Sequence, residues 1–189
     1  MRNKNSRNIW RLWRPIYGFT WATWQASSYA HYASYLNALQ NSIVLDIGTG
    51  TGEYIKSLKK NDSCQYIFTD PDEKSLLIAQ KNALELGLNC TFIVGGINEI
   101  LESKLEYTHI SLVHVLSVLD DPECSIIKIK NIQTSQVKII AYLSRFNASS
   151  ERNKKSKLGF SRLNRKWLES EFISCRVGLF NRMYESSSS

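Results

Sequence analysis

A short glycine-rich segment after an apolar run carries the residues of this chain best suited to bind a ligand. Residues 44–54 read Val-Leu-Asp-Ile-Gly-Thr-Gly-Thr-Gly-Glu-Tyr, so Asp46 ends the run and Gly48, Gly50 and Gly52 alternate after it. Because glycine has no Cβ, its backbone amides can approach a ligand closely at the start of a following helix. The pattern predicts a strand that ends in a turn binding a small polar or charged cofactor.

Position 53 separates two classes of cofactor. The dinucleotide fingerprint needs its third glycine there, whereas this chain has Glu53, whose carboxylate would repel a pyrophosphate. NAD, NADP and FAD are therefore disfavoured. Asp46 before a G-x-G-x-G turn instead suits a cofactor with its own positive charge, such as the ammonium and sulfonium of S-adenosylmethionine. In these residues the sequence resembles the class I S-adenosylmethionine-dependent methyltransferases.

The elements that must position these residues follow in the order that the resemblance implies. The patterns predict a short helix over 53–60, a strand over 65–69, a helix over 73–86, strands over 90–94 and 137–143, and a helix over 162–172. Residues 173–184 are expected to form at most a short hairpin. The resemblance implies an α/β fold: a Rossmann-like doubly wound, mostly parallel sheet with helices on both faces and a short antiparallel C-terminal end.

The predicted domain organisation has three parts. Residues 1–42 form a basic, aromatic and helical N-terminal segment that caps the active site. Residues 43–185 form the S-adenosylmethionine-binding methyltransferase domain, and residues 186–189, all serine, form a disordered tail.

Further cofactor contacts are expected after the second and third strands. Asp70 follows Asp46 at close to the roughly 20-residue spacing of an acidic ribose ligand. Asp70-Pro71-Asp72 is by itself more typical of a turn and helix N-cap, and both roles can coexist. Gly96 stands where the family usually has an acidic residue for adenine, so backbone or the Asn98 amide must replace it. The resemblance implies a set of cofactor-binding residues: Asp46, Gly48, Thr49, Gly50, Gly52, Asp70, Pro71, Gly96, Ile97, Asn98 and His114.

His114 is the candidate catalytic residue. It follows the predicted fourth strand, where the resemblance implies that His114 and Ser117 face the methyl end of the cofactor. A lone histidine is more often a satisfied interior side chain, and it is the position of His114 after the predicted fourth strand that favours a functional role. Methyl transfer mainly needs alignment and exclusion of water, so a base is optional, and His114 or His31 would serve if the acceptor must lose a proton.

Aromatic residues are concentrated before the first strand. Packing against the sheet is the simplest interpretation for most of these rings. In the family, however, segments before the first strand often close over the substrate. The resemblance therefore implies a set of candidate substrate-lining residues: Tyr17, Trp21, Trp24, Tyr29 and Tyr32.

Composition and charge indicate the cellular compartment of the protein and the kinds of partner that it contacts. The chain has 189 residues, 43% of them hydrophobic, and scattered cysteines and histidines that predict neither disulfides nor a metal site. Without a stretch typical of a membrane span or signal peptide, a cytoplasmic location is expected, although the acid-free, Arg-rich start also resembles a transit peptide. The flanks 1–14 and 145–189 are basic and the middle is mildly acidic, which favours contact of the ends with membrane phosphate or nucleic acid.

Three functions remain open. The leading prediction is methyl transfer to an oxygen or nitrogen of a small molecule or lipid headgroup, with the basic aromatic N-terminus contacting an anionic membrane peripherally. The second is methylation of RNA or another nucleic acid, although the (Asp/Asn)-Pro-Pro-aromatic signature of enzymes acting on exocyclic amines is missing. The third is cyclisation or lysis of S-adenosylmethionine, because the predicted residues hold the cofactor and do not define the acceptor.

Overall fold

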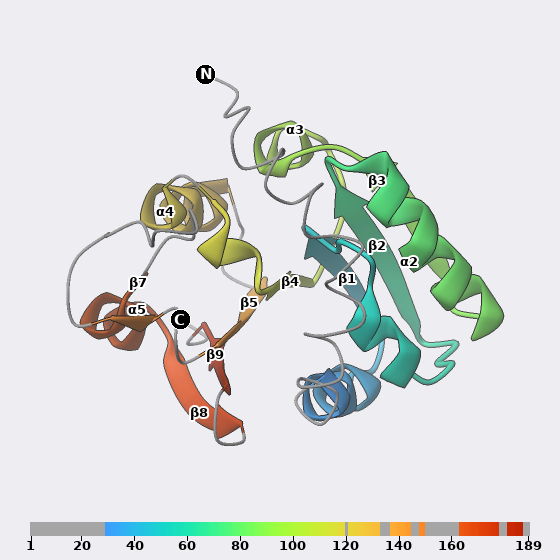
Figure 1. The fold of residues 1–189 in the computed structure, drawn as a ribbon, viewed down its shortest axis with the longest axis horizontal. Coiled ribbons are helices and arrows are strands. Elements are labelled where there is room, and N and C mark those ends of the chain that lie inside the picture. The colour runs from blue at the N-terminus through green and yellow to red at the C-terminus, as the bar shows by residue number, and fades with distance from the viewer. Residues whose placement is uncertain are drawn as a thin grey trace.

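One mixed sheet forms the centre of the protein (Figure 1). The computed structural model describes residues 29–119, 121–132, 137–144, 148–149, 163–177 and 181–186. Within them, seven strands pair in the order β3-β2-β1-β4-β5-β9-β8, and β6 (Ala148–Ser149) pairs with β7 (Leu163–Asn164) separately. The strands of the large sheet are β1 (Ser42–Ile47), β2 (Cys64–Asp70), β3 (Cys90–Val94), β4 (His109–Val113), β5 (Lys138–Ser144), β8 (Ile173–Val177) and β9 (Asn181–Glu185).

The strand order reverses between β1 and β4. The first five strands are parallel, and the chain builds outward from β1 to β2 and β3, then crosses back to β4 and β5. Ligands of open α/β sheets bind outside the carboxyl ends of the strands where the order reverses in this way. The ends of β1, β2 and β4 therefore meet at the edge where the predicted site residues lie.

Helices cover both faces of the sheet. One face packs against a helix at residues 29–37, the 3₁₀ helix η1 (Glu53–Ser57) and α2 (Glu73–Glu85). The other packs against α3 (Ile97–Leu101), the 3₁₀ helix η2 (Val115–Ser117), α4 (Pro122–Ile132) and α5 (Arg165–Glu171). The α/β, Rossmann-like fold class is confirmed. None of the helices in the described part of the chain is long and apolar enough to cross a membrane.

The alternation of side-chain directions along the strands explains why the core has two layers, one on each face of the sheet. Val44 belongs to the core under α2, whereas the next residue, Leu45, belongs to the core under α4. Tyr66 and Ile67 divide in the same way on β2. Since successive strand side chains point to opposite faces, a central strand covered on both sides must be apolar at nearly every position. Asp46 is therefore an exception that needs a specific environment.

The element after the glycine turn is shorter than predicted. The sequence pattern predicts a helix over 53–60, but the structure has only the 3₁₀ helix η1. Leu58 is extended, with φ −71° and ψ 153°, and its side chain is buried in the core. Burial of Leu58 accounts for the early end of the helix, because a further helical turn would change the direction of that side chain.

The C-terminal region is more ordered than predicted. Instead of at most a short hairpin, β8 and β9 form two five-residue antiparallel strands that extend the sheet beyond β5. The unpaired edge of β5 supplies the backbone partners, and Met183 and Tyr184 are buried on opposite faces. Ser186, which the sequence places in the disordered tail, donates its N–H to Ile139 O at 2.9 Å and continues the pairing. The predicted helix at 162–172 is confirmed only as α5.

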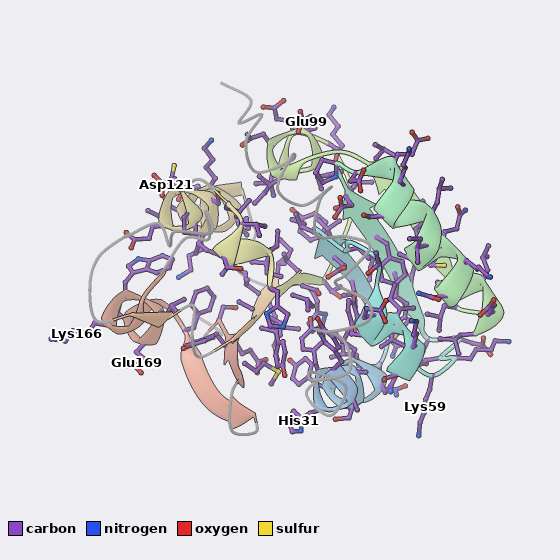
Figure 2. All side chains as sticks on the ribbon, viewed as in Figure 1. His31, Lys59, Glu99, Asp121, Lys166 and Glu169 are labelled. Carbon is purple, nitrogen blue, oxygen red and sulfur yellow. The ribbon has the colours of Figure 1, made fainter. Side chains whose placement is uncertain are left out.

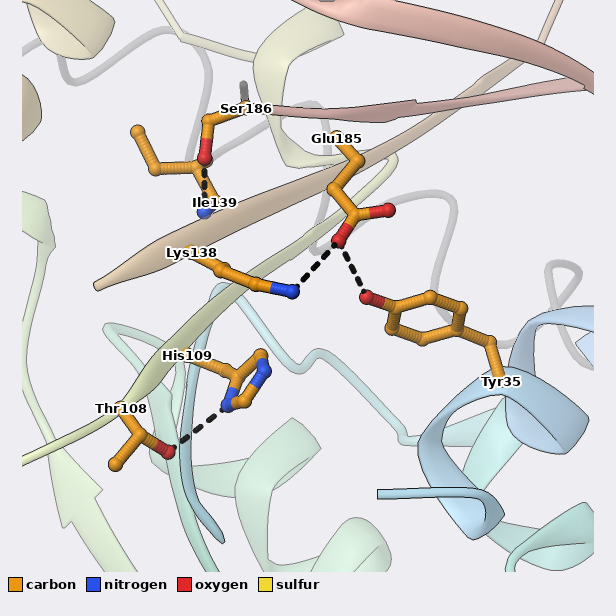
Figure 3. A network of polar contacts seen from close by, with 7 residues as sticks. All are labelled: Tyr35, Thr108, His109, Lys138, Ile139, Glu185 and Ser186. Atoms are coloured by element: carbon orange, nitrogen blue, oxygen red, sulfur yellow. Dashed lines mark hydrogen bonds and ion pairs between the residues drawn. The ribbon is translucent and has the colours of Figure 1, made fainter. Parts of the chain in front are cut away.

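A polar network joins three elements at the opposite end of the sheet (Figure 3). Tyr35, from the helix at 29–37, donates its hydroxyl to Glu185 Oε1 at 2.9 Å. Lys138 Nζ lies 3.6 Å from the same oxygen. Near this pair, the His109 ring shares a 2.9 Å hydrogen bond with Thr108. The network ties the N-terminal helix to the last strand, away from the carboxyl ends of β1, β2 and β4.

Candidate active site

The glycine turn is held in place by the end of β2. Gly48, Gly50 and Gly52 have φ values of 76°, 59° and 64°, which lie in the left-handed region that favours glycine. Thr69 O accepts the N–H groups of Gly48 and Thr49 at 2.8 and 2.9 Å. These hydrogen bonds fix the start of the turn against the end of β2.

Gly48 also permits contact between this turn and the segment after β4. A Cβ added at Gly48 would lie 2.4 Å from Val115 Cγ2, well inside van der Waals contact. Val115 begins η2 and follows His114 directly. The absence of a side chain at position 48 thus lets the His114 segment pack against the glycine turn.

Asp70 connects the ends of β1 and β2. Its Oδ2 accepts the Gly50 N–H at 2.8 Å, and its Oδ1 accepts the Asp72 N–H at 2.7 Å. Burial raises the pKa of Asp70 to about 6, although these two donors act in the opposite direction. Pro71, which follows it, is exposed. The carboxylate retains acceptor capacity for ligand hydroxyls, because each oxygen has two lone pairs.

Asp46 is enclosed beneath the turn. It is fully buried, Thr49 Oγ1 donates to its Oδ2 at 2.6 Å, and Ser111 Oγ donates to its Oδ1. Burial raises its pKa, whereas hydrogen bonds from Ser111 and Thr49 lower it. These contacts of Asp46 are all with the protein interior. Asp46 can therefore act on a bound cation through its negative electrostatic potential and through its hydrogen bond to the glycine turn.

The turn after β3 forms another side of the site. Gly95 N–H donates to Asp70 O at 3.1 Å, which places this turn beside β2. Gly96 precedes α3, where Ile97 is the first residue and Asn98 is exposed. Asn98 Oδ1 accepts a hydrogen bond from Lys128 Nζ at 3.3 Å.

His114 occupies an unusual backbone position after β4. Its φ is 56°, in the left-handed region that few residues other than glycine adopt, and its N–H donates to Tyr142 O at 2.8 Å. Its ring meets Tyr29 and Tyr142 edge-on, with centroid separations of 5.8 and 5.3 Å. Burial lowers the pKa of His114 to about 4, so the imidazole is neutral at pH 7. Ser117 donates its hydroxyl to His114 O at 2.8 Å.

Two enclosed polar atoms in these segments lack a hydrogen-bond partner in the structure. They are Thr51 Oγ1, in the glycine turn, and His114 Nε2. Buried polar atoms are nearly always satisfied in folded proteins, by the protein, water or a ligand. Thr51 Oγ1 and His114 Nε2 are therefore candidates for hydrogen bonds to a ligand or water at this edge of the sheet.

A comparison with protein families identifies the domain that contains these residues. Residues 44–131, from β1 through α4, match the family model for a methyltransferase domain. Residues 44–131 therefore form a methyltransferase domain. No curated protein sequence matches this methyltransferase.

Solved structures share the fold of this methyltransferase at low sequence identity. A methyltransferase from Aquifex aeolicus is 17% identical, with a TM-score of 0.62 over 97% of this chain and 98% of that one. Magnesium protoporphyrin IX methyltransferase from Synechocystis PCC 6803, solved with S-adenosylmethionine, is 19% identical, with a TM-score of 0.59 over 99% and 93%. A candidate O-methyltransferase from Nostoc punctiforme is 18% identical, with a TM-score of 0.62 over 86% of this chain and only 56% of that one.

The predicted substrate-lining aromatics divide into two groups. Tyr17, Trp21 and Trp24 lie outside the described residues. Tyr29 is buried and contacts His114, which places it beside the candidate catalytic residue. Tyr32 is fully buried, and its hydroxyl donates to Ser111 Oγ at 2.7 Å. The structure therefore places Tyr32 in the core, directed toward Asp46 through Ser111.

The second candidate base lies apart from this site. His31 is exposed on the helix at 29–37, and Figure 2 shows it at the outer edge of the molecule. Among the described residues, no group of three or more histidine, cysteine or acidic side chains could hold a metal ion.

Sequence patterns alone indicate no role for two hydroxyl groups in these segments. Ser111 is fully buried in β4 and contacts Asp46, and Thr51 carries one of the unpartnered atoms. The available signal for Ser111 was a polar residue within the apolar run Ile110-Ser111-Leu112 of a central strand. The role itself depends on the pairing of Asp46 with Ser111 across β1 and β4, which sequence spacing does not reveal.

Proposed function

We propose that this methyltransferase transfers a methyl group from S-adenosylmethionine to an oxygen or nitrogen of a small molecule or lipid headgroup. The observation that carries the proposal is the arrangement of two buried carboxyl groups around the glycine turn. Gly50 N–H donates to Asp70, and Thr49 Oγ1 donates to Asp46. A cationic cofactor with ribose hydroxyls suits this combination of negative charge and acceptor oxygens.

Each part of the site has a distinct proposed role. Asp70 accepts hydrogen bonds from the ribose, the glycine turn approaches the amino acid part, and Gly96, Ile97 and Asn98 contact the adenine. Asp46 supplies negative potential beneath the turn. When bound, the cofactor would supply a methyl group carried on a sulfonium: the acceptor would bond to the methyl carbon in line as the carbon–sulfur bond breaks, with neutral S-adenosylhomocysteine as the leaving group. The protein orients the acceptor and excludes water, which in oriented systems gives effective molarities of about 10⁵ to 10⁸ M.

His114 is proposed to face the acceptor. Its ring is neutral at pH 7 and its Nε2 is enclosed, so it can accept a hydrogen bond or a proton from the attacking group. A pKa of about 4 makes it a weak base. Its role is therefore mainly to orient the acceptor, and transfer of the proton is completed only as the acceptor becomes more acidic during attack.

The names of two fold neighbours agree with the proposed acceptor, one with a small molecule and the other with an oxygen atom. One is a magnesium protoporphyrin IX methyltransferase, and the other is described as a candidate O-methyltransferase. The basic and aromatic sequence at 1–14 adds the proposal that this end contacts an anionic membrane, where tryptophan and arginine suit the headgroup region.

The first experiment is calorimetric titration of the purified protein with S-adenosylmethionine. Mass spectrometry of the incubated mixture, including copurified lipids and metabolites, then follows the cofactor and any acceptor. Micromolar binding, S-adenosylhomocysteine and a molecule heavier by one methyl group are expected. Absence of binding would contradict the proposal, and a different cofactor product would favour cyclisation or lysis.

The membrane and nucleic acid alternatives separate in a second experiment. Deletion of residues 1–14 should abolish binding to liposomes containing anionic lipid and leave the affinity for S-adenosylmethionine nearly unchanged. Equal liposome binding by both proteins would refute the membrane contact. If nucleic acid is the partner, its affinity should fall steeply with rising salt, because several phosphates are neutralised together.

A further inference from the structure

A chain of buried hydroxyl groups connects the N-terminal helix to Asp46. Tyr32 donates to Ser111 Oγ at 2.7 Å, and Ser111 donates to Asp46 Oδ1. On the other side, Thr49 donates to Asp46 Oδ2 at 2.6 Å. All four side chains are buried, and they come from the helix at 29–37, β4, β1 and the glycine turn.

The directions of these bonds make both carboxyl oxygens acceptors. Ser111 has one hydroxyl proton, which it gives to Asp46 while it accepts the proton of Tyr32. Thr49 Oγ1 accepts the Thr69 N–H at 3.2 Å and gives its own proton to Asp46. These hydroxyls stabilise the ionised form of Asp46, because each is placed to donate to one of its two oxygens.

The groups that face Asp46 do not neutralise its charge. Tyr32 and Tyr54 face it from the helix at 29–37 and from η1, and Asp70 faces it from β2. These groups are uncharged or acidic, and in the described residues no salt bridge involves Asp46. A buried carboxylate is costly without compensation, so hydrogen bonds and a cationic ligand are its available partners.

The position of Tyr32 is fixed by packing as well as by its hydroxyl. Its ring meets Tyr54 edge-on at 5.4 Å between centroids and lies 5.3 Å from Tyr142. Tyr54 belongs to η1, which follows the glycine turn, and Tyr142 belongs to β5, whose backbone accepts the His114 N–H. Docking of the helix at 29–37 and the placement of Asp46 are therefore parts of one arrangement.

We propose that Tyr32 and Ser111 are positioning residues that orient Asp46 and stabilise the glycine turn, so that the helix at 29–37 sets the affinity for the cofactor. This inference rests on the proposed function for the identity of the ligand. It assigns to Tyr32 an internal role in cofactor binding in place of contact with substrate.

The test compares two buried tyrosines that lose only a hydroxyl. Tyr32→Phe removes the donor to Ser111 and keeps the ring. Tyr66→Phe is the matched control, because the Tyr66 hydroxyl is buried and has no hydrogen-bond partner. Calorimetry should show S-adenosylmethionine binding weakened about tenfold by Tyr32→Phe, as expected for loss of one hydrogen bond in this chain, and unchanged by Tyr66→Phe.

A second readout distinguishes positioning from general loss of structure. Carboxyl-carbon NMR should show the pKa of Asp46 raised by Tyr32→Phe and by Ser111→Ala, because each weakens or removes donation to the carboxylate. In both variants, the decline of S-adenosylmethionine affinity at acidic pH should begin at a higher pH than in wild type. Ser111→Ala also serves if Tyr32→Phe folds poorly, which thermal melting would reveal.

The outcomes separate this inference from the proposed function. If wild type does not bind S-adenosylmethionine, the proposed function fails, and cofactor control by this helix fails with it, even if the variants shift the pKa of Asp46. A second outcome is that wild type binds S-adenosylmethionine, while Tyr32→Phe and Tyr66→Phe bind it with equal affinity and show the same pKa for Asp46. In that case only the positioning role is overturned.

Discussion

At the scale of single residues, Asp70 combines burial with a place at the end of β2, where it contacts the glycine turn. Its two backbone donors and its pKa of about 6 mean that its charge changes close to physiological pH. Because the folded pKa is raised, the protonated carboxyl stabilises the fold at low pH, and this contribution is lost as pH rises through about 6. The ionised form, which the proposed contact with ribose hydroxyls requires, is therefore populated at the expense of stability.

Asp70→Asn tests this assignment through pH. Wild-type affinity for S-adenosylmethionine should decline below about pH 6 as Asp70 is protonated. The variant should bind roughly tenfold more weakly at pH 7.5, as expected for loss of a charged acceptor, and should lack that part of the decline. Calorimetry between pH 5 and 8 measures both effects, with Asp62→Asn as a control because Asp62 is exposed. An unchanged acid limb in Asp70→Asn would contradict the assignment.

The change of stability with pH that is expected from His114 has the opposite sign to that expected from Asp70. Its pKa is lowered to about 4 by burial, so folding favours the neutral ring, and this stabilisation is lost as pH falls from about 6.5 toward 4. His114→Asn keeps a residue that tolerates the left-handed backbone. The fall in unfolding free energy over that range should be smaller in the variant by on the order of 1 to 3 kcal/mol, measured by urea denaturation. Equal pH dependence in both proteins would show that His114 is not enclosed.

At the scale of elements, the site depends on how closely the glycine turn and η2 approach. Gly52 is the N-cap of η1, and a Cβ there would lie 2.5 Å from Ile55 and 2.9 Å from Ala79 of α2. Gly48 meets Val115 in a similar way. The side-chain nitrogen of Asn82, also in α2, donates to Thr51 O at 3.2 Å. The turn is thus enclosed by two neighbouring elements, which explains its rigidity better than glycine content alone.

Gly48→Ala and Gly87→Ala form a matched pair. Both glycines have positive φ, at 76° and 63°, so each alanine incurs the left-handed backbone penalty of about 1 to 2 kcal/mol. Only Gly48→Ala also forces a clash with Val115, because an added Cβ at Gly87 meets nothing closer than 3.9 Å. Urea denaturation should show Gly48→Ala to be the more destabilising, by a further 1 to 3 kcal/mol or so, and cofactor affinity should fall only in that variant. Equal losses would mean that the η2 segment moves away at little cost.

At the scale of the whole molecule, the sheet carries different interactions at its two ends. The carboxyl ends of β1, β2 and β4 hold the site residues. The opposite end holds the network of Tyr35, Lys138 and Glu185, which joins the helix at 29–37 to β5 and β9. The same helix therefore contacts the site through Tyr32 and the last strand through Tyr35.

Tyr35→Phe separates stability from binding. Loss of its hydrogen bond to Glu185 should lower the unfolding free energy by about 0.5 to 1.5 kcal/mol. The Lys138–Glu185 pair is partly exposed and contributes little. A double-mutant cycle with Glu185→Gln measures the coupling, and cofactor affinity should stay nearly constant. If binding falls as much as in Tyr32→Phe, the two ends of the helix are not independent.

The sequence by itself determined the elements whose signals are local. The apolar runs at β1, β2 and β3, the glycine turn after Asp46, and the acidic residue ending β2 are all visible within a few residues. The tertiary structure decided what depends on distant segments. Tyr32 and Ser111 are separated by 79 positions and Ser111 and Asp46 by 65, so only packing brings them together. β8 and β9 form full strands because the edge of β5 is available for pairing. The 3₁₀ helix η1 ends early because the Leu58 side chain is buried. In both cases, interactions with distant segments outweigh the local propensity of the sequence.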